Sequence, residues 1–336
     1  MHFHLRRPRH PRGLTVVHVV IIVAVVGFIV FVLGAVFLAA IMLPALGKAR
    51  KAAQQIKDGT QVRGIHQAMV IWAGSNRELY PLPSRLDRQG ATVAPGAPTN
   101  PKPGSAADAA DPQRAKDTTA NIFSIMIFNN LLTPGIMVSP AEPNANIVEM
   151  PNYNLTRPTK AVSPQNAQWD PAFSADFTAG KSNVSYAHMQ PSGFLVSPDP
   201  ELKGAPSGRM VHWGHTYDGT TAILGTRFPQ VASVNPSSPT TTTPTFVNPN
   251  SLSTRFFGRG GGWGGNTVFS DNYVNFDVIH SGRPHQAERQ YLTAAGKQLA
   301  DCNHFDESDD PTQSNVFLGI FTTAGEKPAD FKPIWD

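Results

Sequence analysis

The chain has 336 residues, a formal net charge of +4, only 15% charged residues, 30 prolines and 28 glycines. This composition argues against a compact helical protein and favours a β-leaning chain with many loops. The single cysteine, Cys302, excludes an intrachain disulfide, and basic residues at the two ends of one apolar segment favour membrane topology over nucleic-acid binding.

That apolar segment, residues 14–43, predicts a transmembrane helix. It contains no Asp, Glu, Lys or Arg, and its polar side chains are Thr15 and His18. A helix needs roughly 20 apolar residues to cross a bilayer, and the core helices of soluble proteins rarely have so long an apolar run. A cleaved signal peptide is the nearest alternative, but its apolar region would be about half as long.

Residues 1–13 form a basic leader that predicts the orientation of this helix. Arg6, Arg7, Arg9 and Arg12 precede the apolar run, and positively charged flanks stay in the cytoplasm. We therefore expect a single-pass protein of the cell inner membrane with a cytoplasmic N-terminus and a C-terminal domain in the periplasm or at the cell surface. A nucleic-acid-binding tail is the other reading of the arginines, and no nucleic-acid partner is expected.

The junction between leader and helix carries a processing motif. Gly13 and Leu14 end the basic leader and begin the apolar run, which resembles the signal of type IV prepilins and type II secretion pseudopilins. The resemblance implies that a prepilin peptidase cuts after Gly13 and that the new N-terminus at Leu14 is methylated. It also gives an assembly role to the fifth residue after the cut, which is acidic in the family and is His18 here. A histidine cannot supply that negative charge, and a buried imidazole is expected to be neutral.

Residues 44–80 are expected to continue the anchor as a stalk helix. The sequence from Leu43 to Arg50 resembles the segment after the anchor in pseudopilin-like proteins of planctomycetes, although Pro44 lies further from the cut than in that group. Apolar and small residues then recur at helical spacing: Ile56, Val62, Ile65, Ala68, Met69 and Trp72. We expect this stripe to pack on the globular domain rather than to form a groove for a partner.

Residues 81–336 are expected to form an extracytoplasmic α+β domain. The resemblance implies a pilin-like architecture, with the long N-terminal helix packed on an antiparallel β-sheet. Pro- and Gly-rich composition predicts two exposed low-complexity insertions, at 88–117 and 235–250. The remaining patterns predict a helix over 118–132, strands over 182–189, 221–228 and 315–321, and a hairpin over 266–276.

Asp271 and Asn272 mark the turn of the predicted hairpin. The planctomycete group has an Asp-Gly turn with a histidine ten residues before it, and this chain has Asn272 and Gly261 at those two places. The glycine-rich run at 258–265 has no Lys-Ser/Thr and no following helix, so it does not predict a phosphate-binding loop.

The C-terminal part holds acidic residues that could bind calcium. Asp306, Asp309 and Asp310 are the candidates, because Ca²⁺ takes oxygen ligands and the resemblance implies a calcium site in a C-terminal loop, as in major pseudopilins. Their spacing does not match an EF-hand, so a solvated acidic loop is the alternative, and no other cofactor is expected. A zinc site at Cys302 and His304 is weaker, because paired cysteines are missing.

Together these features favour a non-enzymatic, membrane-anchored, pseudopilin-like structural subunit of a type II secretion or pilus-like assembly. Its partners would be the membrane, other pilin-like subunits and, for processing, the prepilin peptidase. The alternative is a single-pass anchored cell-surface domain that binds a glycan or a protein through its loops and no longer polymerises. An enzyme is not expected, since the sequence has no nucleophile elbow, metalloprotease motif or P-loop.

Overall fold

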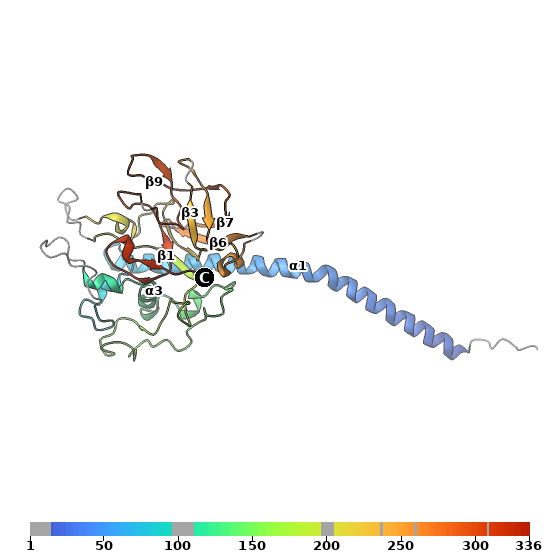
Figure 1. Ribbon diagram of the computed structural model, residues 1–336. Coiled ribbons are helices and arrows are strands. Elements are labelled where there is room, and N and C mark those ends of the chain that lie inside the picture. Colours follow the sequence, from blue (N-terminus) through green and yellow to red (C-terminus); the bar gives the residue numbers. More distant parts are fainter. Residues whose placement is uncertain (1–14, 96–110, 196–204, 236–237, 259–260, 308) are drawn as a thin grey trace, which may run out of the picture. The chain divides into compact units, whose positions relative to one another are not determined.

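The computed structural model describes residues 15–95, 111–195, 205–235, 238–258, 261–307 and 309–336. The chain divides into two compact units, Met1–Ala53 and Gln54–Asp336. A single helix, α1 (Val16–Ser75), contributes to both units (Figure 1).

The part of α1 in the first unit is apolar and exposed. Its most apolar 18-residue window has a mean hydropathy of 3.3, and none of that window is buried. Within the described residues, α1 alone is long and apolar enough to cross a membrane. The helix is therefore compatible with a single membrane span or a signal anchor. Pro44 lies inside α1, where its missing N–H removes one helical hydrogen bond.

The part of α1 in the second unit buries one face. Residues at spacings of three and four are buried: Asp58, Val62, Ile65, His66, Ala68, Met69 and Ala73. The predicted stripe therefore packs on the domain, except that Ile56 is 72% exposed. The helix ends at Ser75, earlier than the predicted residue 80, because Arg77 and Glu78 adopt positive φ angles of 60° and 58° and reverse the chain.

The main sheet has five antiparallel strands in the order β11 (Leu318–Gly319), β1 (Tyr186–Met189), β2 (Ala222–Thr226), β6 (Gly262–Phe269) and β7 (Val274–His280). Every residue of β1, β2 and β6 is buried, so both faces of these strands are covered. Helix α3 (Thr119–Phe128) adds Ile122, Phe123 and Met126 to the same core as the second half of α1. The α+β prediction is confirmed; a relationship to pilins stays a prediction.

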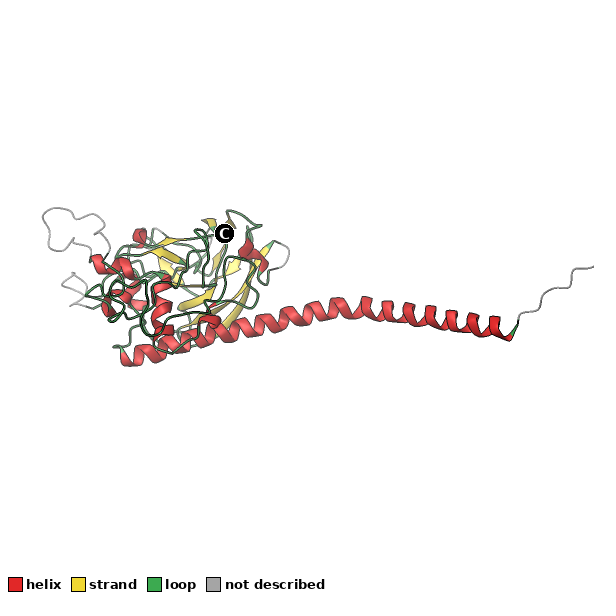
Figure 2. Cartoon of the chain, turned by 90° about the horizontal axis from the view of Figure 1, so that it is seen from below, coloured by secondary structure: helices red, strands yellow, loops and turns green. Residues whose placement is uncertain are grey.

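The rest of the second unit consists of short elements joined by loops (Figure 2). Two-stranded sheets are formed by β3 (Val231–Val234) with β5 (Pro244–Phe246), β4 (Thr241–Thr242) with β8 (His285–Gln286), β9 (Gln290–Leu292) with β10 (Gln298–Ala300), and β12 (Phe321–Thr323) with β13 (Lys332–Pro333). The short helices are α2 (Pro83–Leu86), η1 (Pro112–Lys116), η2 (Pro134–Met137), η4 (Gly208–His212), η5 (Leu252–Arg255) and η6 (Pro328–Asp330).

Both regions predicted as exposed insertions contain buried parts. Of the region 88–117, residues 96–110 lie outside the described residues, but Lys116 is buried and pairs with Asp87 at 3.2 Å. In the region 235–250, Thr242 and Phe246 are buried in short strands. Composition alone misled here, because ion pairs and two- or three-residue strands leave no periodic pattern.

Candidate functional site

A buried polar centre of the second unit lies where α1 meets the main sheet, at Asp58. This side chain is fully buried and accepts four hydrogen bonds. The donors are Ser139 Oγ (2.5 Å), Tyr186 Oη (2.9 Å), Thr226 Oγ1 (3.0 Å) and Asn266 Nδ2 (2.8 Å). Three of these donors belong to the adjacent strands β1, β2 and β6. One carboxyl group therefore ties the helix to three strands of the sheet.

Burial is the main cause of the raised pKa of Asp58, and the hydrogen bonds from Ser139, Asn266, Tyr186 and Thr226 oppose it. No cationic side chain contributes to its environment, as no ion pair involves Asp58 among the residues described. The group is a satisfied carboxyl that acts through hydrogen bonds alone.

Two turns further along α1, His66 makes a second polar contact across the domain. Its Nδ1 lies 3.1 Å from Asn272 Oδ1, and its Nε2 lies 2.9 Å from Tyr80 Oη. Because the amide oxygen can only accept, Nδ1 carries the proton, and Nε2 accepts from the tyrosine hydroxyl. Burial lowers the pKa of His66 to about 4, so the ring is neutral near pH 7.

Asp271 and Asn272 lie at the hairpin turn between β6 and β7, where the sequence places them. Asp271 Oδ1 accepts from Tyr273 N at 2.9 Å, and Asn272 N donates to Phe269 O at 2.8 Å. Asn272 has φ +69°, a left-handed conformation that asparagine tolerates better than most residues. The structure thus brings Asn272 to the helix through His66, a contact that the sequence pattern did not predict.

The predicted processing residues, Gly13 and Leu14, lie outside the described residues. His18 is exposed on α1 in the first unit, where its Nδ1 contacts the Thr15 hydroxyl one turn earlier. Its assembly role stays a prediction.

The acidic residues proposed for calcium do not share a common centre. Asp306 pairs with Arg209, whereas both carboxylate oxygens of Asp310 accept from nearby groups that include Gln313 N and Asn315 N. The backbone oxygen of Asp309 accepts from Ala294 N at 2.9 Å. Across the part of the chain that the structure describes, no three His, Cys, Asp or Glu side chains are placed to hold a metal ion. Their calcium role gains no support from these contacts and stays a prediction.

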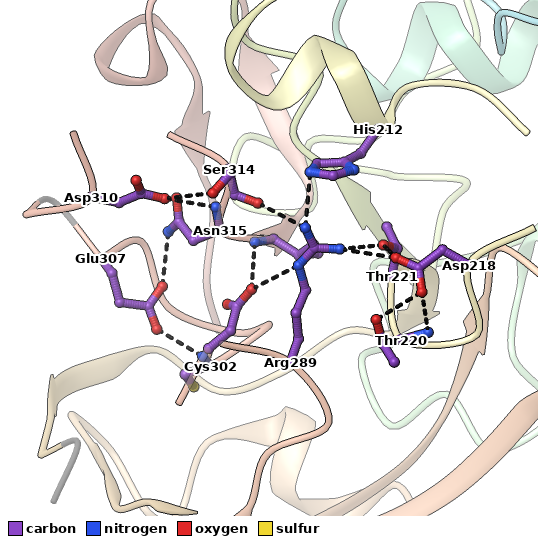
Figure 3. A network of polar contacts seen from close by, with 12 residues as sticks. His212, Asp218, Thr220, Thr221, Arg289, Cys302, Glu307, Asp310, Ser314 and Asn315 are labelled. Atoms are coloured by element: carbon purple, nitrogen blue, oxygen red, sulfur yellow. Dashed lines mark hydrogen bonds and ion pairs between the residues drawn. The ribbon is translucent and has the colours of Figure 1, made fainter. Parts of the chain in front are cut away.

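A further polar network centres on Arg289 (Figure 3). Its guanidinium donates to His212 Nε2 at 3.0 Å and to Thr221 Oγ1, and it lies 3.3 Å from Asp218 and 3.6 Å from Asp301. Burial raises the pKa of Asp301 to about 7, and the arginine opposes this shift. Burial, and then the Arg289 charge, lower the pKa of His212 to about 4.

The same network extends to Glu307, which accepts from Cys302 N at 2.7 Å and from Asn315 Nδ2 at 2.9 Å. Burial raises the pKa of Cys302 well above its ordinary value, so the thiol is protonated and a poor nucleophile. Together, the contacts of Arg289 and Glu307 connect segments that lie far apart in the sequence. We therefore assign this network a role in stabilising the folded domain.

Asp58, His66 and Arg289 were not singled out from the sequence. Asp58 and His66 had a usable signal, because both occupy positions on the buried face of a helix whose other members are apolar. Arg289 had none, since its partners come from η4 (His212), the turn before β2 (Asp218 and Thr221) and the loop after β10 (Asp301).

Comparison of the chain with protein-family models found no match, and comparisons with curated proteins and with solved structures found none either.

Proposed function

We propose that this protein is a membrane-anchored structural subunit, pseudopilin-like, of a type II secretion or pilus-like assembly. The observation that carries the proposal is α1 itself. Its first part is an exposed apolar helix, and its second part is built into the core of an antiparallel sheet domain. A helix that both inserts in a bilayer and forms part of a folded domain suits a subunit held in the membrane and packed against neighbours.

Small residues on the apolar part of α1 support close helix packing. Apart from chain neighbours and the backbone of the helix itself, no atom of the described residues lies within 4 Å of a Cβ added at Gly27 or Gly34. Ala35, Ala39 and Ala40 lie on the same exposed segment. In lipid, helices associate through such small faces because their backbones can approach closely.

The contacts of Asp58 and His66 support a rigid attachment of the second part of α1 to the sheet. Buried hydrogen bonds to three strands and to a hairpin turn resist sliding of the helix over the sheet. A subunit that transmits force between membrane and domain needs this rigidity.

The decisive test is the mature N-terminus of the full chain, measured by mass spectrometry after expression with an active or an inactive prepilin peptidase. We expect a chain that begins at methylated Leu14 only with the active enzyme, and loss of processing in Gly13→Leu. Two further variants each carry a single cysteine, at Val25 or at Phe28, in a Cys302→Ser background. In each variant, the cysteines of neighbouring copies should cross-link in the membrane. An unprocessed chain without cross-links would overturn the proposal.

A second candidate is a single-pass anchored binding domain. It is favoured by an arginine-lined hollow beyond the end of α1.

A further inference from the structure

An open hollow of about 460 Å³ lies at the C-terminal end of α1, within the second unit. Its wall comes from the last turn of α1, the following reversal, α2 and the residues just after α2, and it includes Trp72, Arg77, Arg85 and Arg88. The reversal is held in place, because Glu78 O accepts from His215 N at 3.2 Å and Leu79 forms a β-bridge with Gly214. The backbone that carries Arg77 is thus fixed rather than free.

The charge of this hollow is unbalanced. Among the residues that the structure describes, its lining includes three arginines and no Asp or Glu. None of the three has an ion pair or a side-chain hydrogen bond to another described residue, whereas the buried Arg114, Arg209 and Arg227 each pair with a carboxylate. Burial lowers the pKa of Arg85, and repulsion from the charges of Arg77 and Arg88 lowers it further. An anion placed there would relieve that repulsion.

A second hollow, of about 490 Å³, shares Arg85, Leu86 and Arg88 with the first. Exposed amide side chains line it: Gln89, Gln165, Asn166 and Gln168. Its one acidic residue, Asp87, is buried and already pairs with Lys116 and with backbone N–H groups. The two hollows adjoin at the residues they share, and we refer to the pair as the cleft: Trp72 and Arg77 line only the first hollow, and the amides line only the second.

Trp72 supplies a positioned aromatic face. It is half-buried and packs against the main core, so its ring is held by the fold while part of it reaches the hollow. An indole face can stack on a sugar ring, guanidinium groups bind carboxylate or sulfate groups, and amides exchange hydrogen bonds with hydroxyls.

We propose that this cleft binds an acidic polysaccharide, with a sugar ring against Trp72, its carboxylate or sulfate groups at Arg77, Arg85 and Arg88, and neighbouring hydroxyls at the amides. This site goes beyond the structural role proposed above, and it does not depend on fibre formation. A glycan fits better than a nucleic acid, because the arginines gather in one hollow instead of following a stripe and because the adjoining hollow is lined by uncharged amides.

The test uses the full chain in phosphatidylcholine nanodiscs, without processing, so that its outcome is separate from that of the peptidase experiment. Polygalacturonate and dextran sulfate are the acidic probes, neutral dextran is the uncharged control, and binding is measured by calorimetry. The cleft variant is Arg77→Gln/Arg85→Gln/Arg88→Gln. The matched control is Arg157→Gln/Arg255→Gln/Arg283→Gln, which removes the same charge from exposed positions elsewhere.

We expect one acidic probe to bind the wild type, a loss of at least tenfold in the cleft variant and less than a twofold change in the control variant. Trp72→Ala should weaken binding and also remove a ligand-induced change in tryptophan fluorescence. Equal losses in both triple variants, equal binding of neutral dextran, or no binding of either acidic probe would overturn the proposal. Tighter binding of a single-stranded oligonucleotide through the same arginines would replace the glycan with a nucleic acid.

Discussion

Nδ1 of His66 donates to Oδ1 of Asn272 across 3.1 Å, and this bond joins α1 to a hairpin turn that is 206 positions away in sequence. Asn272 therefore contributes to the fold in two ways. Its side chain satisfies a buried histidine, and its backbone adopts φ +69°.

Two substitutions at Asn272 separate the contribution of the side-chain hydrogen bond from that of the backbone conformation. Asn272→Gly keeps the positive φ and loses the bond to His66, so it should lower the free energy of unfolding by about 1 kcal/mol. Asn272→Ala loses the same bond, and alanine has neither the freedom of glycine nor the polar side chain with which asparagine tolerates the left-handed region, so it should cost about 1–2 kcal/mol more than Asn272→Gly. Urea unfolding of the detergent-solubilised chain measures both values. Equal losses would show that the turn does not impose the backbone strain.

The domain should tolerate replacement of the Asp58 carboxyl group by an amide but not truncation of this side chain to alanine. In Asp58→Asn the amide nitrogen can replace Oδ1 and donate to the Ser139 and Tyr186 hydroxyls, which rotate to accept, while its oxygen serves Thr226 and Asn266. We expect a change within about 1 kcal/mol, because the amide also avoids the cost of a buried charge. Asp58→Ala leaves buried donors unpaired and should cost about 3 kcal/mol. Similar losses in both variants would contradict this account.

The buried histidines should make stability fall on acidification. Burial lowers the folded-state pKa of His66 to about 4, below the unfolded value of about 6.5. The unfolded chain therefore takes up the proton first as the pH drops. The stabilisation is complete above pH 6.5, is lost progressively between pH 6.5 and 4, and amounts to about 3 kcal/mol for this residue.

His66→Gln should reduce the slope of the unfolding free energy against pH between pH 6.5 and 4. The reduction should correspond to about one proton fewer taken up on unfolding. Comparison with the wild type is essential, because buried carboxyl groups such as Asp301, with raised pKa values, favour folding at low pH and act in the opposite direction. An unchanged slope would mean that His66 takes up a proton equally in both states.

The sequence predicted elements wherever one periodic pattern covered enough residues. The apolar stripe predicted the position of the α1 helix, and the alternation at 266–276 predicted the hairpin turn. It missed that β6 begins at Gly262, because glycine is depleted in strands. Here glycine is required: a Cβ at Gly264 would lie 2.9 Å from the Phe257 carbonyl carbon, and one at Gly265 would strike the Trp263 ring. The polar centre at Asp58 depends on partners up to 208 positions away, and no local pattern carries that information.

Cys302 should be unreactive in the folded chain. It is buried, and burial raises the pKa of its thiol well above the ordinary value. Alkylation by iodoacetamide at pH 8 should therefore proceed only as fast as the domain opens, and at full rate in urea. A cysteine at the exposed position Ala179 in Cys302→Ser provides the accessible control. Equal rates for the two thiols would contradict the burial of Cys302.

Arg227 holds two carboxyl groups at once, Glu142 and Asp336, each at 2.6 Å. Its guanidinium also lies over the rings of Phe177 and Phe256, so the whole group is enclosed. Arg227→Met should cost about 3–5 kcal/mol, because it leaves two buried carboxyls without a cation. Burial raises the pKa of Glu142 and the Arg227 charge opposes this shift, so without the arginine the folded-state pKa of Glu142 rises further and the loss should be larger at pH 8 than at pH 5.

The matched variant for Arg227 also removes the two carboxylate charges that Arg227→Met leaves without a cation. Arg227→Met/Glu142→Gln/Asp336→Asn keeps one amide oxygen at each position, which can still accept from Asn144 N at residue 142 and from Ser253 N at residue 336. We expect the triple variant to recover most of the stability lost in the single variant and to lose its pH dependence, as measured by urea unfolding at both pH values. If it is no more stable than Arg227→Met, the packing of the guanidinium between the two phenylalanine rings, rather than charge pairing, is what stabilises this corner of the domain.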